Sequence, residues 1–194
     1  MSSVRIELPG ALPAWPGEAD PPAALAPMRG AVAHLALDAL AARYAMLSGT
    51  AFYEAVCRHI VEALGLDRAF IGRLAADGAH VEVCAGWGDG RRVQPFTYAL
   101  AGSPCDGTIR HGACIHPRDV RGRFPHDRPL ADDGIEAYAA MPLCDCDGRA
   151  LGLIVALRRS PFDDEAAVRT LLDIFDDRVA AELLRERTER VLNG

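Results

Sequence analysis

The chain has 194 residues, of which 50% are hydrophobic and 25% charged, and its formal net charge is −6 at pH 7. These values are typical of one ordinary globular domain, and the negative charge argues against a general nucleic-acid-binding surface. No apolar run approaches the roughly 20 residues that cross a bilayer, and no basic-then-apolar leader is present. We therefore expect a cytoplasmic protein that binds neither nucleic acid nor membrane, with its six cysteines reduced: Cys57, Cys84, Cys105, Cys114, Cys144 and Cys146.

The first 27 residues contain six of the thirteen prolines, among many alanines and glycines. This composition predicts an extended or disordered tail over 1–27 and a single domain over 28–194. From Met28 onward, apolar residues recur every three to four positions, which predicts a helix over 28–47. A second helix is predicted over 51–64, with Thr50 as its N-cap and Gly65 as its end.

Five strands are predicted next, at 68–74, 79–87, 94–100, 136–145 and 149–158. Asp77-Gly78 is a strong hairpin signal between the first two strands, and Cys146-Asp147-Gly148 joins the last two. Between the third and fourth strands, residues 101–134 form an irregular insert rich in Pro, Gly, Cys and His. A long helix over 163–190 ends the domain, with acidic residues in its first turn and arginines near its end, as the helix dipole favours.

This order of elements predicts an α+β fold with a central antiparallel sheet of five or six strands. The helices are expected on one face of the sheet and the capping insert on the other. A last helix of this length spans about 42 Å, which is longer than a small sheet can cover. We expect it to find a partner helix in a two-fold dimer. Its apolar seam consists of Val168, Leu172, Phe175, Val179 and Leu183.

Five short motifs, in this order, resemble those of GAF sensor domains found beside bacterial histidine kinases and diguanylate cyclases. They are L-x-G-[ST]-P-C-x at Leu100–Asp106, C-x-[YH]-P at Cys114–Pro117, F-P-x-D at Phe124–Asp127, G-x-E-[AS]-Y at Gly134–Tyr138 and P-L-x-D-x-x-G-x-x-L-G at Pro142–Gly152. The resemblance covers roughly residues 52–187. It implies a GAF fold and a bacterial signal-transduction sensor, but it leaves the ligand open, because GAF domains bind cyclic nucleotides, bilins, haem, amino acids or nothing known.

Two GAF subfamilies are distinguished by motifs that this chain lacks. Bilin-binding members use a Cys-His pair just before the helix that precedes the G-x-E/V-R-A strand. Pro125-His126 stands at that position here, so the resemblance implies no covalent bilin. The N-K-F-D-E signature of cyclic-nucleotide GAF domains is also absent.

A third subfamily, the free-methionine-sulfoxide reductases, places two cysteines ahead of a D-V-x-x-F-P-G-H-I-A-C-D motif. Cys105 and Cys114 stand near those places, and D-V-R-G-R-F-P-H-D is similar to the motif. The nucleophilic cysteine, however, maps near Leu130, which offers no thiolate. We therefore expect no such enzyme, but a redox pair formed by Cys105 and Cys114 remains an alternative.

The candidate ligand-binding residues come from the strands and the insert that should enclose the free sheet face. Strand alternation groups Tyr98 with Phe96 and Leu100, but it does not say whether that side faces the insert or the helices. The aromatic residues could stack on a planar ligand or fill the pocket themselves. The candidates are Tyr98, Cys105, Ile115, His116, Phe124, His126, Tyr138 and Met141.

Histidines and cysteines also crowd the segment 111–126, but without the CxxC or HxxxH spacing of metal sites. We expect neither a metal nor a catalytic site. The sequence thus predicts a sensory domain that binds a small molecule non-covalently and signals through dimerisation or a partner protein. The alternatives are a thiol-based redox sensor or enzyme using Cys105 and Cys114, and a ligand-free dimerisation module.

Overall fold

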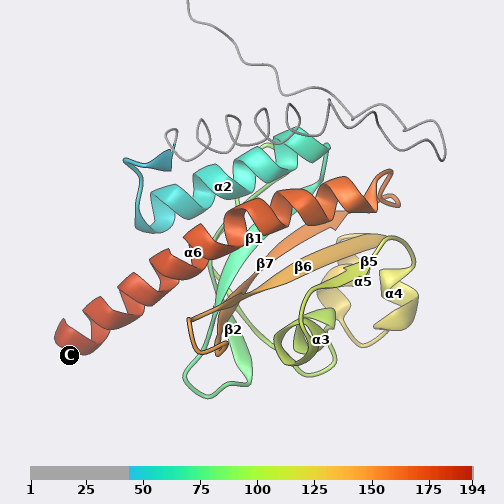
Figure 1. Ribbon diagram of the computed structural model, residues 1–194. Helices are drawn as coiled ribbons and strands as arrows, with labels where there is room; N and C mark the ends of the chain where they lie inside the picture. Colours follow the sequence, from blue (N-terminus) through green and yellow to red (C-terminus); the bar gives the residue numbers. More distant parts are fainter. Residues whose placement is uncertain (1–43, 194) are drawn as a thin grey trace, which may run out of the picture. The chain divides into compact units, whose positions relative to one another are not determined.

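The computed structural model describes residues 44–193, and the elements discussed below belong to the unit that begins at Leu47 (Figure 1). The expected tail over 1–27 and most of the helix expected over 28–47 lie outside the described residues. Within the described part of the chain, no helix is both long enough and apolar enough to cross a membrane.

Helix α2 spans Gly49–Leu64 and ends as predicted. Gly65 adopts a left-handed conformation with φ 60°, and its N–H donates to the Val61 carbonyl. The predicted N-cap at Thr50 is wrong, because Ser48 precedes the helix in an extended conformation and makes no side-chain cap hydrogen bond. The first turn is capped from elsewhere: the Gly49 N–H donates to a carboxylate oxygen of Glu182 at 2.5 Å.

The sheet is antiparallel throughout and has the order β3-β2-β1-β7-β6-β5, with β4 also paired to β2. The predicted α+β fold class is confirmed. The sheet has seven strands because short strands in the connections also pair. The strands are β1 Arg68–Leu74, β2 His80–Gly88, β3 Arg91–Arg92, β4 Thr97–Ala99, β5 Cys114–His116, β6 Ala137–Cys144 and β7 Ala150–Arg158.

The third predicted strand, over 94–100, is reduced to the three residues of β4. Pro95 has no N–H to donate to a ladder, which explains why regular pairing does not extend through this segment. The Phe96 carbonyl still accepts from the Val83 N–H at 2.8 Å, so the segment stays attached to β2.

The two faces of the sheet carry different layers. Phe70, Tyr138 and Val155 face the insert and belong to one buried cluster with insert residues such as Cys105 and Leu130. Their strand neighbours point the opposite way, toward the side on which α2 and α6 run next to each other (Figure 1). The predicted placement is therefore confirmed for α2 and α6 on one face and the insert on the other. The helix expected over 28–47 is not part of this comparison.

The insert is more regular than predicted. It contains β5 and three short helices, which are α3 Pro104–His111, α4 Val120–Arg123 and α5 Arg128–Asp132. Proline in the first turn of α3 and of α5 suits a helix start, because the missing N–H would have had no helical partner there. These helices place the residues that cover the sheet.

Helix α6 spans Glu165–Asn193 and packs against β6, β7 and α2. Its five seam residues are all buried, the most exposed of them being 4% accessible. The seam therefore leaves no free apolar face for a second chain. Large exposed apolar side chains on this helix occur only later, at Val191 and Leu192 among the described residues. The expected dimer stays a prediction.

Glu182 joins the two helices. It lies on α6, is 3% exposed, and accepts hydrogen bonds from the Gly49 N–H and from Arg185 at 2.6 Å. Arg178 adds an ion pair at 3.4 Å. The hydrogen bond from Arg185 is the largest of the effects that hold the pKa of this carboxyl at about 2. Glu182 therefore stays ionised and acts as the N-cap that the α2 sequence does not supply.

Replacing Glu182 with glutamine should lower the free energy of unfolding by about 2 kcal/mol at pH 7. Breaking a buried pair costs about 3–5 kcal/mol, and the half-exposed arginines reduce that figure. Because the folded pKa lies below the unfolded value, this stability is present above about pH 4.5 and is lost as the pH falls toward 2. Urea unfolding of variant and wild type at pH 7 and pH 3 measures the difference, which should shrink at pH 3.

The matched control is Glu189→Gln. Glu189 lies on the same helix and pairs with the same Arg185, but its side chain is 54% exposed. Its loss should cost less than about 0.5 kcal/mol. A Glu182 variant whose deficit is the same at both pH values would contradict the proposed charge effect.

Candidate functional site

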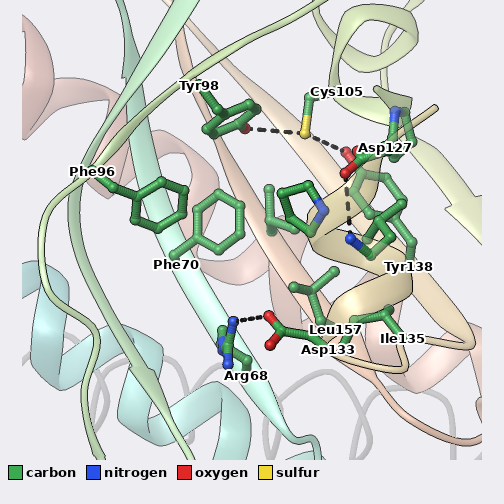
Figure 2. Close-up of a pocket in the computed structure, with 14 residues that line it drawn as sticks. Arg68, Phe70, Phe96, Tyr98, Cys105, Asp127, Asp133, Ile135, Tyr138 and Leu157 are labelled. Atoms are coloured by element: carbon green, nitrogen blue, oxygen red, sulfur yellow. Dashed lines mark hydrogen bonds and ion pairs between the residues drawn. The ribbon is translucent and has the colours of Figure 1, made fainter. Parts of the chain in front are cut away.

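A cavity of about 70 Å³ lies between the sheet and the capping insert (Figure 2). Its walls come from three parts of the chain: the strands of the sheet, the insert, and the segment that leads into β4. The lining is mostly apolar, which is usual for small-molecule sites, but the volume is well below the roughly 300–1,000 Å³ of typical ligand pockets. The lining residues are Arg68, Phe70, Phe96, Tyr98, Pro104, Cys105, Asp127, Pro129, Leu130, Asp133, Ile135, Tyr138, Val155 and Leu157.

A neutral hydrogen-bonded cluster occupies one end of the cavity. The sulfur of Cys105 accepts from the Tyr98 hydroxyl at 3.1 Å and from the Tyr138 hydroxyl at 3.2 Å. Thr108 lies 3.3 Å from the same Tyr138 hydroxyl. Burial raises the pKa of the Cys105 thiol and of both tyrosines. The cluster therefore stays uncharged at neutral pH.

Asp127 is the acidic group beside this cluster. Its carboxylate accepts from the Leu130 N–H at 3.3 Å and so caps α5. Burial raises the pKa of this carboxyl, and no cationic side chain among the described residues forms an ion pair with it. Asp127, Tyr98 and Pro129 also line an adjoining hollow of about 300 Å³. Asp127 can therefore accept a hydrogen bond from a ligand in either space.

An ion-pair network closes the opposite end. The Arg68 guanidinium lies 2.5 Å from a carboxylate oxygen of Asp133, a pair that Figure 2 marks. It also lies 3.4 Å from a carboxylate oxygen of Asp89. Arg159 joins the same network, with contacts of 2.7 Å to Asp89 and 3.0 Å to Asp67. The network ties the end of α5 to the start of β1 and to the turn between β2 and β3, so ion pairs between separate segments hold this side of the cavity together.

Six of the eight predicted site residues lie in or beside this region. Tyr98, Cys105 and Tyr138 line the cavity, and His126 lines the adjoining hollow. His116 and Phe124 do not line it. Their rings contact each other at 5.3 Å, and the His116 ring is 6.1 Å from Tyr138, so they support the cavity wall from behind.

Ile115 and Met141 are placed away from the cavity. Ile115 pairs with Ala139, and Met141 pairs with Ile154 in the next strand. Paired residues point to the same side of a sheet, and this side faces the helices. Alternation already puts Met141 opposite Tyr138 in β6 and Ile115 opposite His116 in β5, so these candidates could not all line one cavity. Only the structure shows that the side of Tyr138 meets the insert.

Several lining residues were missed. Phe70, Val155 and Leu157 are indistinguishable in sequence from ordinary core residues of buried strands. Asp127 could have been found, because it is the acidic residue of the F-P-x-D motif. Arg68 could not, because it reaches the cavity only from the start of β1.

The redox alternative depends on the two thiols Cys105 and Cys114, and the sulfur of Cys114 lies 3.1 Å from Nε2 of His116. Cys105 and Cys114 are both free, and burial raises the pKa of each thiol. Reactive cysteines need the opposite shift. Over residues 44–193, no group of three or more His, Cys, Asp or Glu residues is arranged to hold a metal ion.

Comparison with known proteins identifies a family model and a group of solved structures. The GAF domain model matches residues 49–183. No curated protein sequence matches the chain. Among solved structures, the chromophore-binding domain of a Stigmatella aurantiaca bacteriophytochrome mutant in the Pr state is similar, with a TM-score of 0.62 and 19% identity over 78% of this chain and 59% of that one.

A bacteriophytochrome from R. palustris is similar with a TM-score of 0.64 and 13% identity, over 84% of this chain and 40% of that one. The wild-type chromophore-binding domain of Stigmatella aurantiaca phytochrome P1 gives a TM-score of 0.60 and 20% identity, over 86% and 63%. The chain thus spans less than two thirds of each of these structures. At such identities, the likeness shows a shared fold.

Proposed function

The chain belongs to the GAF domain family, and we propose that it is a cytoplasmic sensory domain that binds a small molecule non-covalently between the sheet and the capping insert. Binding would be passed on through dimerisation or through a partner protein. The free state of all six cysteines supports a reducing compartment.

The cavity carries this proposal. It combines an apolar floor from Phe70, Tyr138 and Val155 with polar groups at its ends, which is the usual composition of a small-molecule site. Non-covalent binding is favoured because Cys105, the cysteine that lines the cavity, is a protonated thiol that two phenols already contact. Solved structures with this fold include chromophore-binding domains, and the aromatic side chains of the lining suit a planar ligand.

The ligand should occupy more than the inner cavity. A volume of about 70 Å³ is smaller than the roughly 150 Å³ of an engineered cavity that holds benzene. The adjoining hollow adds about 300 Å³ on the far side of Tyr98 and Asp127. A ligand that displaces the Tyr98 ring would join the two spaces, and its N–H or cationic group would meet the Asp127 carboxylate.

Native mass spectrometry of the freshly purified protein tests the proposal directly, because a retained small molecule adds a defined mass. Replacing Asp127 with asparagine should reduce ligand retention about tenfold or more, because a charge-assisted hydrogen bond is lost. Asparagine can still cap α5, so the stability should change little. The control is Asp132→Asn on the same helix, an exposed residue outside the cavity lining.

A protein that retains no molecule, and that shows no thermal shift with any planar compound offered to it, would contradict the proposal and favour the ligand-free dimerisation module. The dimerisation route has its own test. A clean monomer by light scattering at micromolar concentration, with and without ligand, would leave only signalling through a partner protein.

A further inference from the structure

A second hollow, of about 400 Å³, lies on the other side of Arg68 and Phe96 from the inner cavity. These two side chains line both spaces and form the partition between them. Phe96 is 43% exposed, and its ring lies 6.1 Å from Phe70 and 5.9 Å from Tyr98. The Phe96 ring is therefore partly exposed and at the same time contacts Phe70, which forms part of the cavity floor.

Two glycines of β2 shape this partition. A Cβ on Gly88 would lie 2.7 Å from Cγ of Arg68, and one on Gly86 would lie 3.1 Å from Cβ of Val93. Because β2 has no side chains at these two positions, Arg68 can lie across the strand and the segment before β4 can approach the sheet. The positions of two lining residues of the outer hollow, Arg68 and Val93, therefore depend on glycine at 86 and 88.

The outer hollow is rich in positive charge on a chain with a net charge of −6. Its charged lining residues are Arg68, Arg91, Arg92 and a single carboxylate, Asp89. Asp89 is already shared between Arg159 and Arg68, and Arg92 pairs with Glu54 at 2.9 Å.

Arg91 is the one arginine lining the outer hollow that has no acidic partner among the described residues. It is exposed, and it forms no ion pair with any residue in the described part of the chain. Its guanidinium can therefore contact a ligand anion without first breaking a contact within the protein. Arg68 stands between this group and the aromatic floor.

We propose that the outer hollow and the inner cavity form one site for an aromatic acid, a flat molecule with one anionic group at its outer end and the N–H that meets Asp127 at its inner end. This inference rests on the proposed function and names its ligand class. The apolar body would lie against Phe96 and Phe70, and the anionic group would be bound by Arg91 with support from Arg68. The inference rests on this arrangement: the aromatic rings of Phe70 and Phe96 lie toward the inner cavity, and the unpaired guanidinium of Arg91 lies in the outer hollow.

Two fluorescent probes of similar shape test this on the full chain. Anilinonaphthalene sulfonate carries the anion, and the neutral phenylnaphthylamine lacks it. We expect the sulfonate to bind more tightly, and added salt to weaken the sulfonate alone. Arg91→Gln should weaken the sulfonate about fivefold, the size expected for an exposed ion pair, and leave the neutral probe unchanged. The control is Arg149→Gln, which removes another exposed arginine, from the turn between β6 and β7, and should affect neither probe.

The possible failures are separable. If the neutral probe binds and the sulfonate shows no dependence on Arg91 or on salt, the inference is overturned and the proposed cavity stands. Equal losses of sulfonate affinity in the Arg91 and Arg149 variants would also overturn it, because the effect would then be one of net charge. If neither probe binds the folded protein, the inference fails, whereas the proposed function is decided separately by whether native mass spectrometry finds a retained molecule.

Discussion

Replacing Tyr138 with alanine should lower the free energy of unfolding by about 3–5 kcal/mol, the usual cost of truncating a large buried aromatic side chain. Tyr138 is 1% exposed and lies in the cluster that joins the sheet to the insert. Its ring forms part of the cavity floor, and its hydroxyl contacts Cys105 and Thr108. Alanine would remove the ring, enlarge the cavity and leave these polar groups with fewer partners.

Urea unfolding followed by circular dichroism measures this loss, and Tyr138→Phe separates the ring from the hydroxyl. Phenylalanine keeps the ring and removes one hydrogen-bonding group, so its cost should be about 1 kcal/mol. A loss of ligand binding in place of a loss of stability would assign Tyr138 a role in the binding site. If alanine abolishes ligand retention with little loss of stability, the ring is a binding platform in a loosely packed pocket and not a core residue.

Gly152→Ala should cost more than about 3 kcal/mol, beyond the usual range for an overpacked core site. A Cβ at this position would lie 2.1 Å from the carbonyl oxygen of Gly72 and 2.9 Å from Cα of Arg73. Both atoms belong to the backbone of β1, the neighbour of β7 in the centre of the sheet. No rotamer change can relieve this contact, so the two strands would have to separate.

Gly107→Ala is the control for this prediction. Gly107 lies within α3, and nothing is within 4 Å of a Cβ built on it. Alanine should therefore be neutral or stabilise the protein by up to about 1 kcal/mol, because glycine is the poorer helix former. A Gly152 variant that unfolds within 1 kcal/mol of wild type would show that β1 and β7 do not approach as closely as described.

Local signals explain which elements could be predicted from sequence. The hairpin at Asp77-Gly78 and the end of α2 at Gly65 depend on residues that suit tight turns and left-handed backbone, and the structure contains both. The start of α2 could not be predicted in the same way. Its capping group is Glu182, which is 133 positions away in the chain.

The candidate site also combines residues that local motifs could predict with residues that only the folded sheet could place. The short motifs around Cys105 and Tyr138 pointed to residues that do line the cavity. Ile115 and Met141 lie on the other face of the sheet. Alternation separates them from His116 and Tyr138, but it does not say which of the two sides meets the insert.

By itself, the sequence determined the order of the main helices and strands from α2 to α6, the α+β class and the GAF family, because these follow from periodicity, turn residues and short motifs along the chain. Only the tertiary structure decided which sheet face the insert covers, how small the cavity is, and that Arg68, Phe96 and Asp127 border it. These three residues come from β1, from the segment before β4 and from the insert. They meet only after distant strands have paired, and no local pattern records that pairing.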